Sequence, residues 1–270
     1  MTLERSPDDV ISDLPDWRGA TWAELDGGLT NRSWLLEKDG RKAVLKIDDE
    51  PRTAPYNTRP AEAAVQTLAA QAGLANAVLF SGRQVYLTEY IDGAAWNPGI
   101  LDQDGKIEQL ASALRRLHAL PLSGRSFNAL GAAKQYVPSI ENPDKQLVSV
   151  CLDVIRKTRL PNNLCCCHND LVAENIIMTP KLKFLDWEYA CDNDPMFDLA
   201  TIVEHHELSD AAAQKLLHAY FDGAGERWRT KLAEQQRLYL ALHCLWLASR
   251  PDSSDKAVGR LAERLATSCS

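Results

Sequence analysis

The sequence lacks several features that would each assign it to a familiar class of protein. No apolar run approaches the roughly 20 residues that cross a membrane. Residues 1–9 carry neither the basic nor the apolar segment of a secretory signal. Positive charge is not in excess, because 30 Lys and Arg against 37 Asp and Glu give a net charge of −7. We therefore expect no membrane insertion, no secretion and no nucleic-acid partner.

Cysteine is present, but not in the arrangement that builds a zinc site or a disulfide framework. The seven cysteines are odd in number, Cys165, Cys166 and Cys167 are adjacent, and no paired Cys-x-x-Cys spacing occurs. Successive residues of a strand point to opposite faces, so we expect these thiols to be buried like small apolar side chains. Free thiols are typical of a reducing compartment, which predicts a cytoplasmic protein.

Internal repeats and low-complexity tracts are also absent, and 270 residues suffice for one large domain or two lobes. Asp39-Gly40 separates the apolar runs 34–37 and 43–47, which predicts a β-hairpin. An Ala-rich helix is expected over 61–72 and a second hairpin over 77–91. The remainder is expected to be mainly helical, near 106–120, 144–158, 196–207, 209–221 and 228–249. Residues 1–8 and 250–256 are expected to be loose.

This order of elements predicts an α+β fold with two lobes. Asp92-Gly93 interrupts the strand pattern, so the boundary is placed there. A small, mainly antiparallel lobe would span 1–91, and a larger, mainly helical lobe would span 92–270.

The most informative segment is Cys167 to Asn175, which has the spacing H-x-D-x-x-x-x-N. A second acid, Asp186, follows at the end of another short apolar run. This constellation is typical of kinases. Asp170 would orient and deprotonate the attacking hydroxyl group, whereas Asn175 and Asp186 would bind Mg²⁺ on the phosphates of ATP. His168 is expected to support the backbone of the loop.

Upstream residues fit the same chemistry. Lys46 lies on a predicted strand, where its ammonium group could reach the phosphates, and Glu62 in the next helix could form an ion pair with it. The segment from Thr88 to Gly93 would join the lobes, and the backbone of Glu89 and Ile91 could bind adenine. No G-x-x-x-x-G-K-[ST] run occurs, which excludes a P-loop mechanism.

A loop that could cover the nucleotide precedes Lys46. Its segment Asp26-Gly27-Gly28-Leu29-Thr30-Asn31 lies between two predicted strands and offers backbone amides to phosphate oxygens. It does not have the G-x-G-x-x-G pattern. The residues expected to contact the nucleotide here are Gly27, Gly28, Thr30 and Asn31.

Together these motifs resemble the aminoglycoside phosphotransferase and choline kinase superfamily over roughly residues 20–250, and the likeness implies a protein-kinase-like fold. The segments 27–31 and 185–190 are most similar to choline/ethanolamine kinases and bacterial thiamine kinases. By this resemblance Asp198, in Met196-Phe197-Asp198-Leu199-Ala200, braces the catalytic loop through hydrogen bonds.

The resemblance also suggests residues for the acceptor. Choline kinases hold a quaternary ammonium group in an aromatic box beside acids, and Trp246 falls where that family keeps a box tryptophan. Other contributors would be Trp187, Glu188 and Glu204. These residues predict a small, cationic alcohol such as choline, ethanolamine or thiamine as acceptor, with an aminoglycoside or an amino sugar as the alternative.

Three other classes can be weighed against this interpretation. Between Asp186 and Asp198 there is no room for the activation loop of a protein kinase. A non-catalytic pseudokinase would be expected to have lost the ionisable residues that this chain retains. A metal-dependent hydrolase could be built on His205-His206, but adjacent helical residues point about 100° apart and suit one metal poorly.

Overall fold

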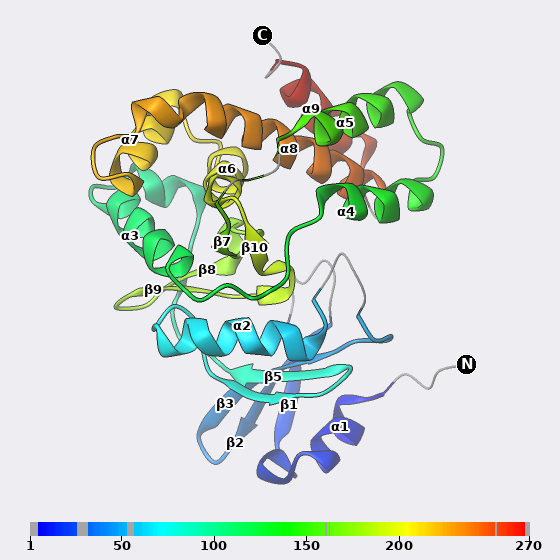
Figure 1. The fold of residues 1–270 in the computed structure, drawn as a ribbon. Coiled ribbons are helices and arrows are strands. Elements are labelled where there is room, and N and C mark those ends of the chain that lie inside the picture. The colour runs from blue at the N-terminus through cyan, green and yellow to red at the C-terminus, as the bar shows by residue number, and fades with distance from the viewer. Residues whose placement is uncertain are drawn as a thin grey trace. The chain divides into compact units, whose positions relative to one another are not determined.

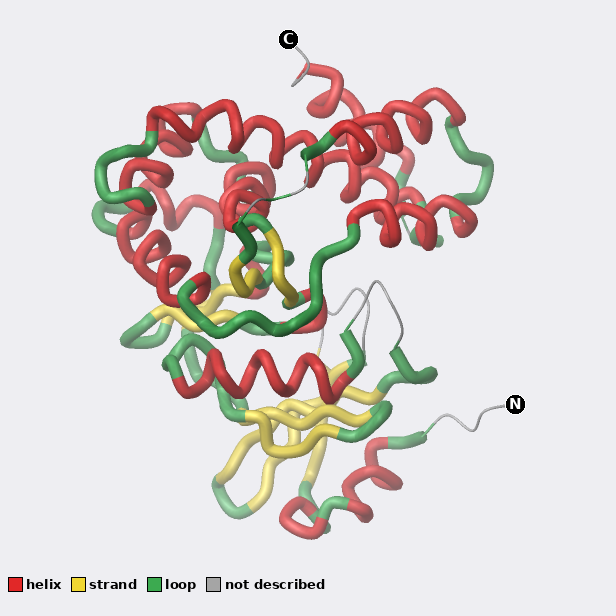
Figure 2. The backbone as a smooth tube through the Cα atoms, viewed as in Figure 1, coloured by secondary structure: helices red, strands yellow, loops and turns green. Residues whose placement is uncertain are grey.

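The computed structural model describes residues 5–25, 32–52, 57–159, 161, 163–251 and 253–267. The chain divides into two compact units, which are described separately. The first unit comprises residues 1–94 and 177–189, and the second comprises 95–176 and 190–270. The segment 177–189, which carries Asp186, therefore belongs with the first unit, whereas the sequence had placed it in the second lobe. Figure 1 labels the elements, and Figure 2 separates helices, strands and loops by colour.

The first unit is built on an antiparallel sheet with the strand order β1-β2-β3-β5-β4. Its strands are β1 Thr21–Leu25, β2 Ser33–Lys38, β3 Arg41–Ile47, β4 Val78–Ser81 and β5 Val85–Glu89. The β2–β3 hairpin turns at Asp39 and Gly40, which both have positive φ values, 50° and 74°. Helix α2, Arg59–Gln71, packs on β4. Both predicted hairpins and the predicted helix are confirmed, with boundaries that differ by at most two residues.

One helix of the first unit, α1 Pro7–Asp13, was expected to begin in a loose segment. Ser6 caps it, because its hydroxyl accepts from the backbone of Asp9 while the Asp9 carboxylate accepts from the backbone of Ser6. Val10 and Ile11 are buried in the same core cluster as Trp34 on β2. The capped start and this apolar contact explain why the segment is ordered.

The second unit is mainly helical. Its helices are α3 Lys106–His118, α4 Ala129–Tyr136, α5 Lys145–Lys157, α6 Pro195–His205, α7 Asp210–Tyr220, α8 Arg229–Ala248 and α9 Asp255–Thr267. The short strands β7 Cys165–Cys167 and β10 Cys191–Asn193 pair antiparallel. Three further short strands, β6 Ala94–Ala95, β8 Ile176–Met178 and β9 Leu182–Phe184, form a sheet in the order β6-β8-β9.

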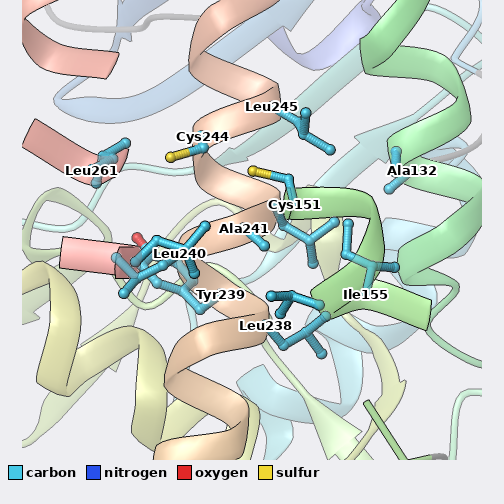
Figure 3. Close-up of a cluster of buried hydrophobic side chains, with 14 of the residues drawn as sticks. Ala132, Cys151, Ile155, Leu238, Tyr239, Leu240, Ala241, Cys244, Leu245 and Leu261 are labelled. Carbon is cyan, nitrogen blue, oxygen red and sulfur yellow. The ribbon is translucent and has the colours of Figure 1, made fainter. Parts of the chain in front are cut away.

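The core of the second unit gathers around α8. The buried apolar residues of this helix between Leu238 and Leu245 pack with Cys151 of α5, Ala132 of α4 and Leu261 of α9 (Figure 3). Helices α4 and α9 were not predicted. Helix α9 buries only Leu261 and Leu265. Two apolar residues four apart form too narrow a stripe to predict a helix from the sequence, before the contact with α8 is known. Within the described parts of the chain, no helix has the length and apolar character needed to cross a membrane.

Candidate active site

An ion pair joins two of the predicted nucleotide-site residues in the first unit. The Nζ atom of Lys46 on β3 lies 2.8 Å from Oδ1 of Asp186, and the two side chains are 16% and 26% exposed. Asp186 follows β9 and has a φ of 57°, a left-handed conformation that Asp tolerates better than most residues. Burial opposes ionisation of Asp186, but the cations of Lys46, Arg52 and Arg59 outweigh it and lower the pKa of this carboxyl group.

Glu62 was expected to pair with Lys46, and the structure pairs it with Arg59 instead. The Arg59 Nη1 donates to Glu62 Oε2 over 2.8 Å, while Nε and Nη2 donate to the two oxygens of Asp48 over 2.6 Å each. Arg59 lies only three residues before Glu62, on the same face of α2, so it takes the place that the sequence assigned to Lys46. Glu62 Oε1 is buried and makes no hydrogen bond within the described part of the chain. Burial raises the pKa of Glu62, although Arg59 and then Lys46 oppose this.

Arg52 extends this network to Glu188. It donates to Asp48 over 3.0 Å and to the Glu188 carboxylate, and the side chains of both Arg52 and Glu188 are at least 93% buried. The charge cluster, as we name it, therefore contains three cations and four acids: Lys46, Asp48, Arg52, Arg59, Glu62, Asp186 and Glu188. Of these, the sequence analysis missed Asp48, Arg52 and Arg59.

Two residues expected to bind substrate are packed inside the first unit. Trp187 has no exposed surface, and its indole N–H donates to the carbonyl of Phe184 over 3.1 Å. Glu188 is 2% exposed and paired with Arg52. The expectation of substrate contact is corrected for Trp187, because its ring fills the core beside Phe184. For Glu188 the observed role is to balance Arg52.

The segment after β5 was expected to bind adenine through Glu89 and Ile91. The N–H of Glu89 donates to the Ala77 carbonyl over 2.9 Å, and its carbonyl accepts from the Asn76 side chain. The N–H of Glu89 is thus already used. The N–H of Ile91 donates to no other described residue, so it stays available for a ligand. The loop residues Gly27, Gly28, Thr30 and Asn31 lie outside the described residues.

In the second unit, the H-x-D-x-x-x-x-N segment forms a compact loop. The Asn175 amide nitrogen donates to both the carbonyl and Oδ2 of Asp170, over 2.9 Å each. Because the nitrogen faces Asp170, the amide oxygen of Asn175 remains as a possible ligand, and it accepts no hydrogen bond in the described chain. Asn169 has a φ of 66°, and its side chain accepts from Asn193 and donates to the Cys191 carbonyl. These contacts fix the loop immediately before Asp170.

Asp198 on α6 holds the start of this loop. Its Oδ2 accepts from the backbone N–H of His168 over 2.9 Å, and its Oδ1 accepts from that of Asn169 over 2.7 Å. Asp198 is fully buried. His118 at the end of α3, which the sequence analysis missed, contacts the same carboxylate, with Nε2 at 3.1 Å from Oδ2. Asp198 therefore holds the backbone of the two residues that precede Asp170, His168 and Asn169.

Glu204 on α6 is engaged within the second unit. Its carboxylate accepts from Arg264 of α9 over 2.5 Å and from Gln236 of α8 over 2.5 Å, and the residue is 8% exposed. Trp246 is half-buried, and the Arg250 guanidinium lies 5.7 Å from its ring centroid. Arg264 therefore compensates the charge of Glu204. The Trp246 ring is in cation–π contact with Arg250.

The adjacent histidines at the C-terminal end of α6, His205 and the capping residue His206, face different partners. His205 Nε2 lies 3.3 Å from a Glu174 oxygen, whereas His206 is buried with Nε2 at 3.4 Å from the Leu171 carbonyl. Burial, and then the neighbouring His205, lower the pKa of His206 to about 4. Neither residue belongs to the group of potential metal ligands found among the described residues.

Each unit, taken by itself, carries groups of the kind that bind a magnesium nucleotide. The first unit supplies an anion-binding ammonium group, Lys46, beside a carboxylate kept ionised, Asp186. The orphaned Oε1 of Glu62 shows that the polar groups around them are incompletely paired. The second unit supplies the amide oxygen of Asn175. Carboxylate and amide oxygens are ligands that Mg²⁺ prefers.

A five-stranded lobe with a Lys–Asp pair and a helical lobe with a braced H-x-D loop define a small-molecule kinase. The chain belongs to the phosphotransferase enzyme family, whose model matches residues 21–232. The predicted superfamily, fold class and enzyme class are confirmed.

Relatives and solved structures agree with this assignment. The protein LicA of Haemophilus influenzae is 32% identical over 245 residues, which cover 82% of this chain and 70% of LicA. A thiamine kinase of Salmonella typhi is 28% identical over 230 residues, 77% of this chain and 76% of the kinase. Choline kinase LicA from Streptococcus pneumoniae has a similar fold, with a TM-score of 0.80 at 21% identity, covering 97% of this chain and 98% of that one. A LicA structure in complex with AMP gives 0.80 at 20% identity, covering 98% of each chain.

Proposed function

We propose that the protein transfers the γ-phosphoryl group of ATP to the hydroxyl group of a small, cationic alcohol of the choline, ethanolamine or thiamine type. The observation that carries the proposal is the Asp170–Asn175 contact on a loop held by Asp198. The Asp170 carboxylate, oriented by Asn175, directly follows His168 and Asn169, whose backbone N–H groups donate to Asp198. A general base needs such positioning.

Each residue has a proposed role in the reaction. Asp170 accepts the proton of the acceptor hydroxyl group as the oxygen attacks phosphorus. Lys46 binds phosphate oxygens, and the backbone N–H of Ile91 binds adenine. Asp186 and Asn175 would hold Mg²⁺, which when bound neutralises charge on the transferred phosphoryl group. The rate enhancement comes mainly from positioning and electrostatics.

The choice of acceptor rests on the relatives more than on the site. One solved relative is named a choline kinase and another relative a thiamine kinase, and both named compounds join a hydroxyl group to a permanent cation. The acids expected to meet that cation, Glu188 and Glu204, already pair with arginines. Because these two acids are already paired, the site does not by itself require a cationic acceptor. An amino sugar or an aminoglycoside, each of which also offers hydroxyl groups, is therefore the second candidate. The six described cysteines are free thiols, which supports a cytoplasmic location.

The test is ADP release from ATP with choline, ethanolamine, thiamine, an amino sugar and an aminoglycoside, each with Mg²⁺ and with a chelator. We expect one acceptor of the first three to stimulate release, only with Mg²⁺. Asp170→Ala should abolish this stimulation while nucleotide binding, measured separately, persists. Full turnover in Asp170→Ala would remove the proposed base. Stimulation only by the amino sugar or aminoglycoside would favour the second candidate.

A further inference from the structure

Strand β7 brings two thiols together on one of its faces. Cys165 and Cys167 are separated by one residue, and side chains alternate along a strand, so both point away from Cys166. Their Sγ atoms lie 3.5 Å apart. Cys167 is fully buried, whereas Cys165 is partly exposed. A ligand can therefore approach the pair from the side of Cys165.

An imidazole completes the group. The ligand atoms of His118, Cys165 and Cys167 all lie within 4.8 Å of one another. His118 Nδ1 lies 2.7 Å from the hydroxyl oxygen of Tyr220, at the end of α7, and Nε2 lies 3.1 Å from Asp198 Oδ2. Tyr220 itself is close enough to both thiols for them to affect its pKa. The His118 ring and the two sulfur atoms thus lie in one cluster.

The Sγ–Sγ distance is close to that in the first shell of a tetrahedral zinc ion, and the His118 ligand atom lies within 4.8 Å of both sulfur atoms. Two thiolates, each about 2.3 Å from zinc, lie about 3.8 Å apart, and a thiolate and an imidazole nitrogen lie about 3.6 Å apart. The observed Sγ–Sγ distance of 3.5 Å needs only a small adjustment. Sequence spacing had argued against zinc because no Cys-x-x-Cys pair occurs, but His118 comes from a different helix, α3.

We propose that Cys165, Cys167 and His118 Nδ1 form a binding site for Zn²⁺, with the Tyr220 hydroxyl group or a water molecule as the fourth ligand. Zn²⁺ enters as both thiols ionise, and the two protons pass to solvent. Asp198 accepts from the other ring nitrogen, Nε2, which is the arrangement that orients a metal-binding imidazole. Burial raises the pKa of the Cys167 thiol.

The site lies behind the catalytic loop and does not include the residues proposed to touch substrate. Cys167 directly precedes His168, and Asp198 binds both His118 and the loop backbone. A bound ion would tie α3 and β7 to this carboxylate. Its role is to stabilise the support of the loop, and the inference does not depend on which acceptor the enzyme uses.

A disulfide between the same two thiols is the competing outcome. Residues two apart on a strand have Cα atoms about 6.6 Å apart, near the upper end of the 4.4–6.8 Å range, roughly, that disulfides span. An imidazole within reach of both sulfur atoms adds nothing to a disulfide but supplies the third ligand of a metal ion. The geometry therefore favours the metal.

The experiment is a titration of the full chain, freed of metal and kept reduced, with Co²⁺ as a spectroscopic stand-in for Zn²⁺. Thiolate coordination gives Co²⁺ an intense near-ultraviolet absorption, and Zn²⁺ should abolish it by displacement. We expect one Co²⁺ per chain. Cys165→Ser and Cys167→Ser should weaken binding ~10-fold or more. Cys166→Ser removes a thiol from the same strand but from its other face, and it should bind as the unmodified protein does.

Three results would overturn the proposal. One is the absence of the absorption in the unmodified protein. Another is its persistence at full intensity in Cys165→Ser. The third is the finding that Cys165 and Cys167 form a disulfide and that the protein, once this bond is reduced, binds no metal. Circular dichroism of each metal-free variant shows whether it has folded, and Cys165→Ser, at the more exposed position, remains informative if the buried Cys167→Ser does not fold.

Discussion

Lys46 and Asp186 form an ion pair, with 2.8 Å between Nζ and Oδ1, inside the first unit. The pair joins the central strand β3 to the segment after β9, two parts of the chain far apart in sequence. Arg59 holds Glu62 beside it. Lys46, which is proposed to bind phosphate, is therefore paired with Asp186, which is proposed to bind magnesium. A nucleotide would have to exchange this contact for contacts of its own.

Lys46→Ala should lower phosphoryl transfer by ~100-fold or more, because it removes the positive charge that is proposed to bind the phosphates. Nucleotide affinity should fall as well, and both can be measured by ADP release and by a binding titration. Lys42→Ala is the matched control. Lys42 lies on the same strand, but it is exposed and pairs with Glu37. Turnover in Lys46→Ala within threefold of the Lys42→Ala value would contradict the assigned role.

Asp198→Asn should slow turnover more than it weakens nucleotide binding. An amide keeps one acceptor oxygen but presents an NH₂ group to the second backbone N–H, so one of the two loop hydrogen bonds is lost. A hydrogen bond to a charged group contributes about 1.5–3 kcal/mol, and we expect a loss of stability of this size in urea unfolding. Asp210→Asn, at an exposed first-turn position of α7, should change neither quantity. A normal kcat in Asp198→Asn would show that the brace is dispensable.

The elements that could be predicted from sequence are those specified by local chemistry. Asp39-Gly40 fixed the β2–β3 turn, and the H-x-D-x-x-x-x-N spacing identified Asp170 and Asn175. Helices α4 and α9 were missed, because their stability depends on packing against α8 rather than on their own residues. The predicted first lobe lacked residues 177–189 for the same reason, because this segment joins the first unit only through tertiary contacts.

The partners of the charged residues could not be predicted from the sequence. Arg52 and Glu188 are 136 residues apart, and Arg264 and Glu204 are 60 apart. Nothing local links either pair. The sequence showed that Glu188 and Glu204 were acids near functional motifs, and it suggested substrate contact. Only the fold shows that an arginine already faces each of them.

The buried histidines predict how stability depends on pH. Burial lowers the pKa of His206 to about 4 from an ordinary value near 6.5. Between these values the unfolded chain binds more protons than the folded chain, so stability is lost as the pH falls below 6.5. At pH 5.5 the loss relative to pH 7 is about 1 kcal/mol for this residue. His243, whose pKa burial also lowers to about 4, adds to it.

Urea unfolding between pH 7 and pH 5 measures this slope. His206→Gln should flatten it, since glutamine has no proton to bind in that window and can still donate to the Leu171 carbonyl. His218→Gln, at an exposed position of α7, is the control for removing an imidazole. The same slope in His206→Gln and in the unmodified protein would show that His206 is not a source of the pH dependence.

Arg264→Ala should destabilise the protein, because it leaves the Glu204 carboxylate in a buried position without its cation. Breaking a fully buried pair costs about 3–5 kcal/mol, and partial exposure of Arg264, 36%, reduces our expectation to about 2–3 kcal/mol. Arg260→Ala, exposed on the same helix, should change stability by less than about 0.5 kcal/mol.

Glu204→Gln combined with Arg264→Ala should recover part of the loss, since a neutral amide no longer needs the cation and can keep its contact with Gln236. If Glu204 instead binds the acceptor, Glu204→Gln will raise the acceptor KM at unchanged stability, and the double variant will recover nothing. The comparison therefore separates a carboxylate that holds α6 to α9 from one that recognises the substrate.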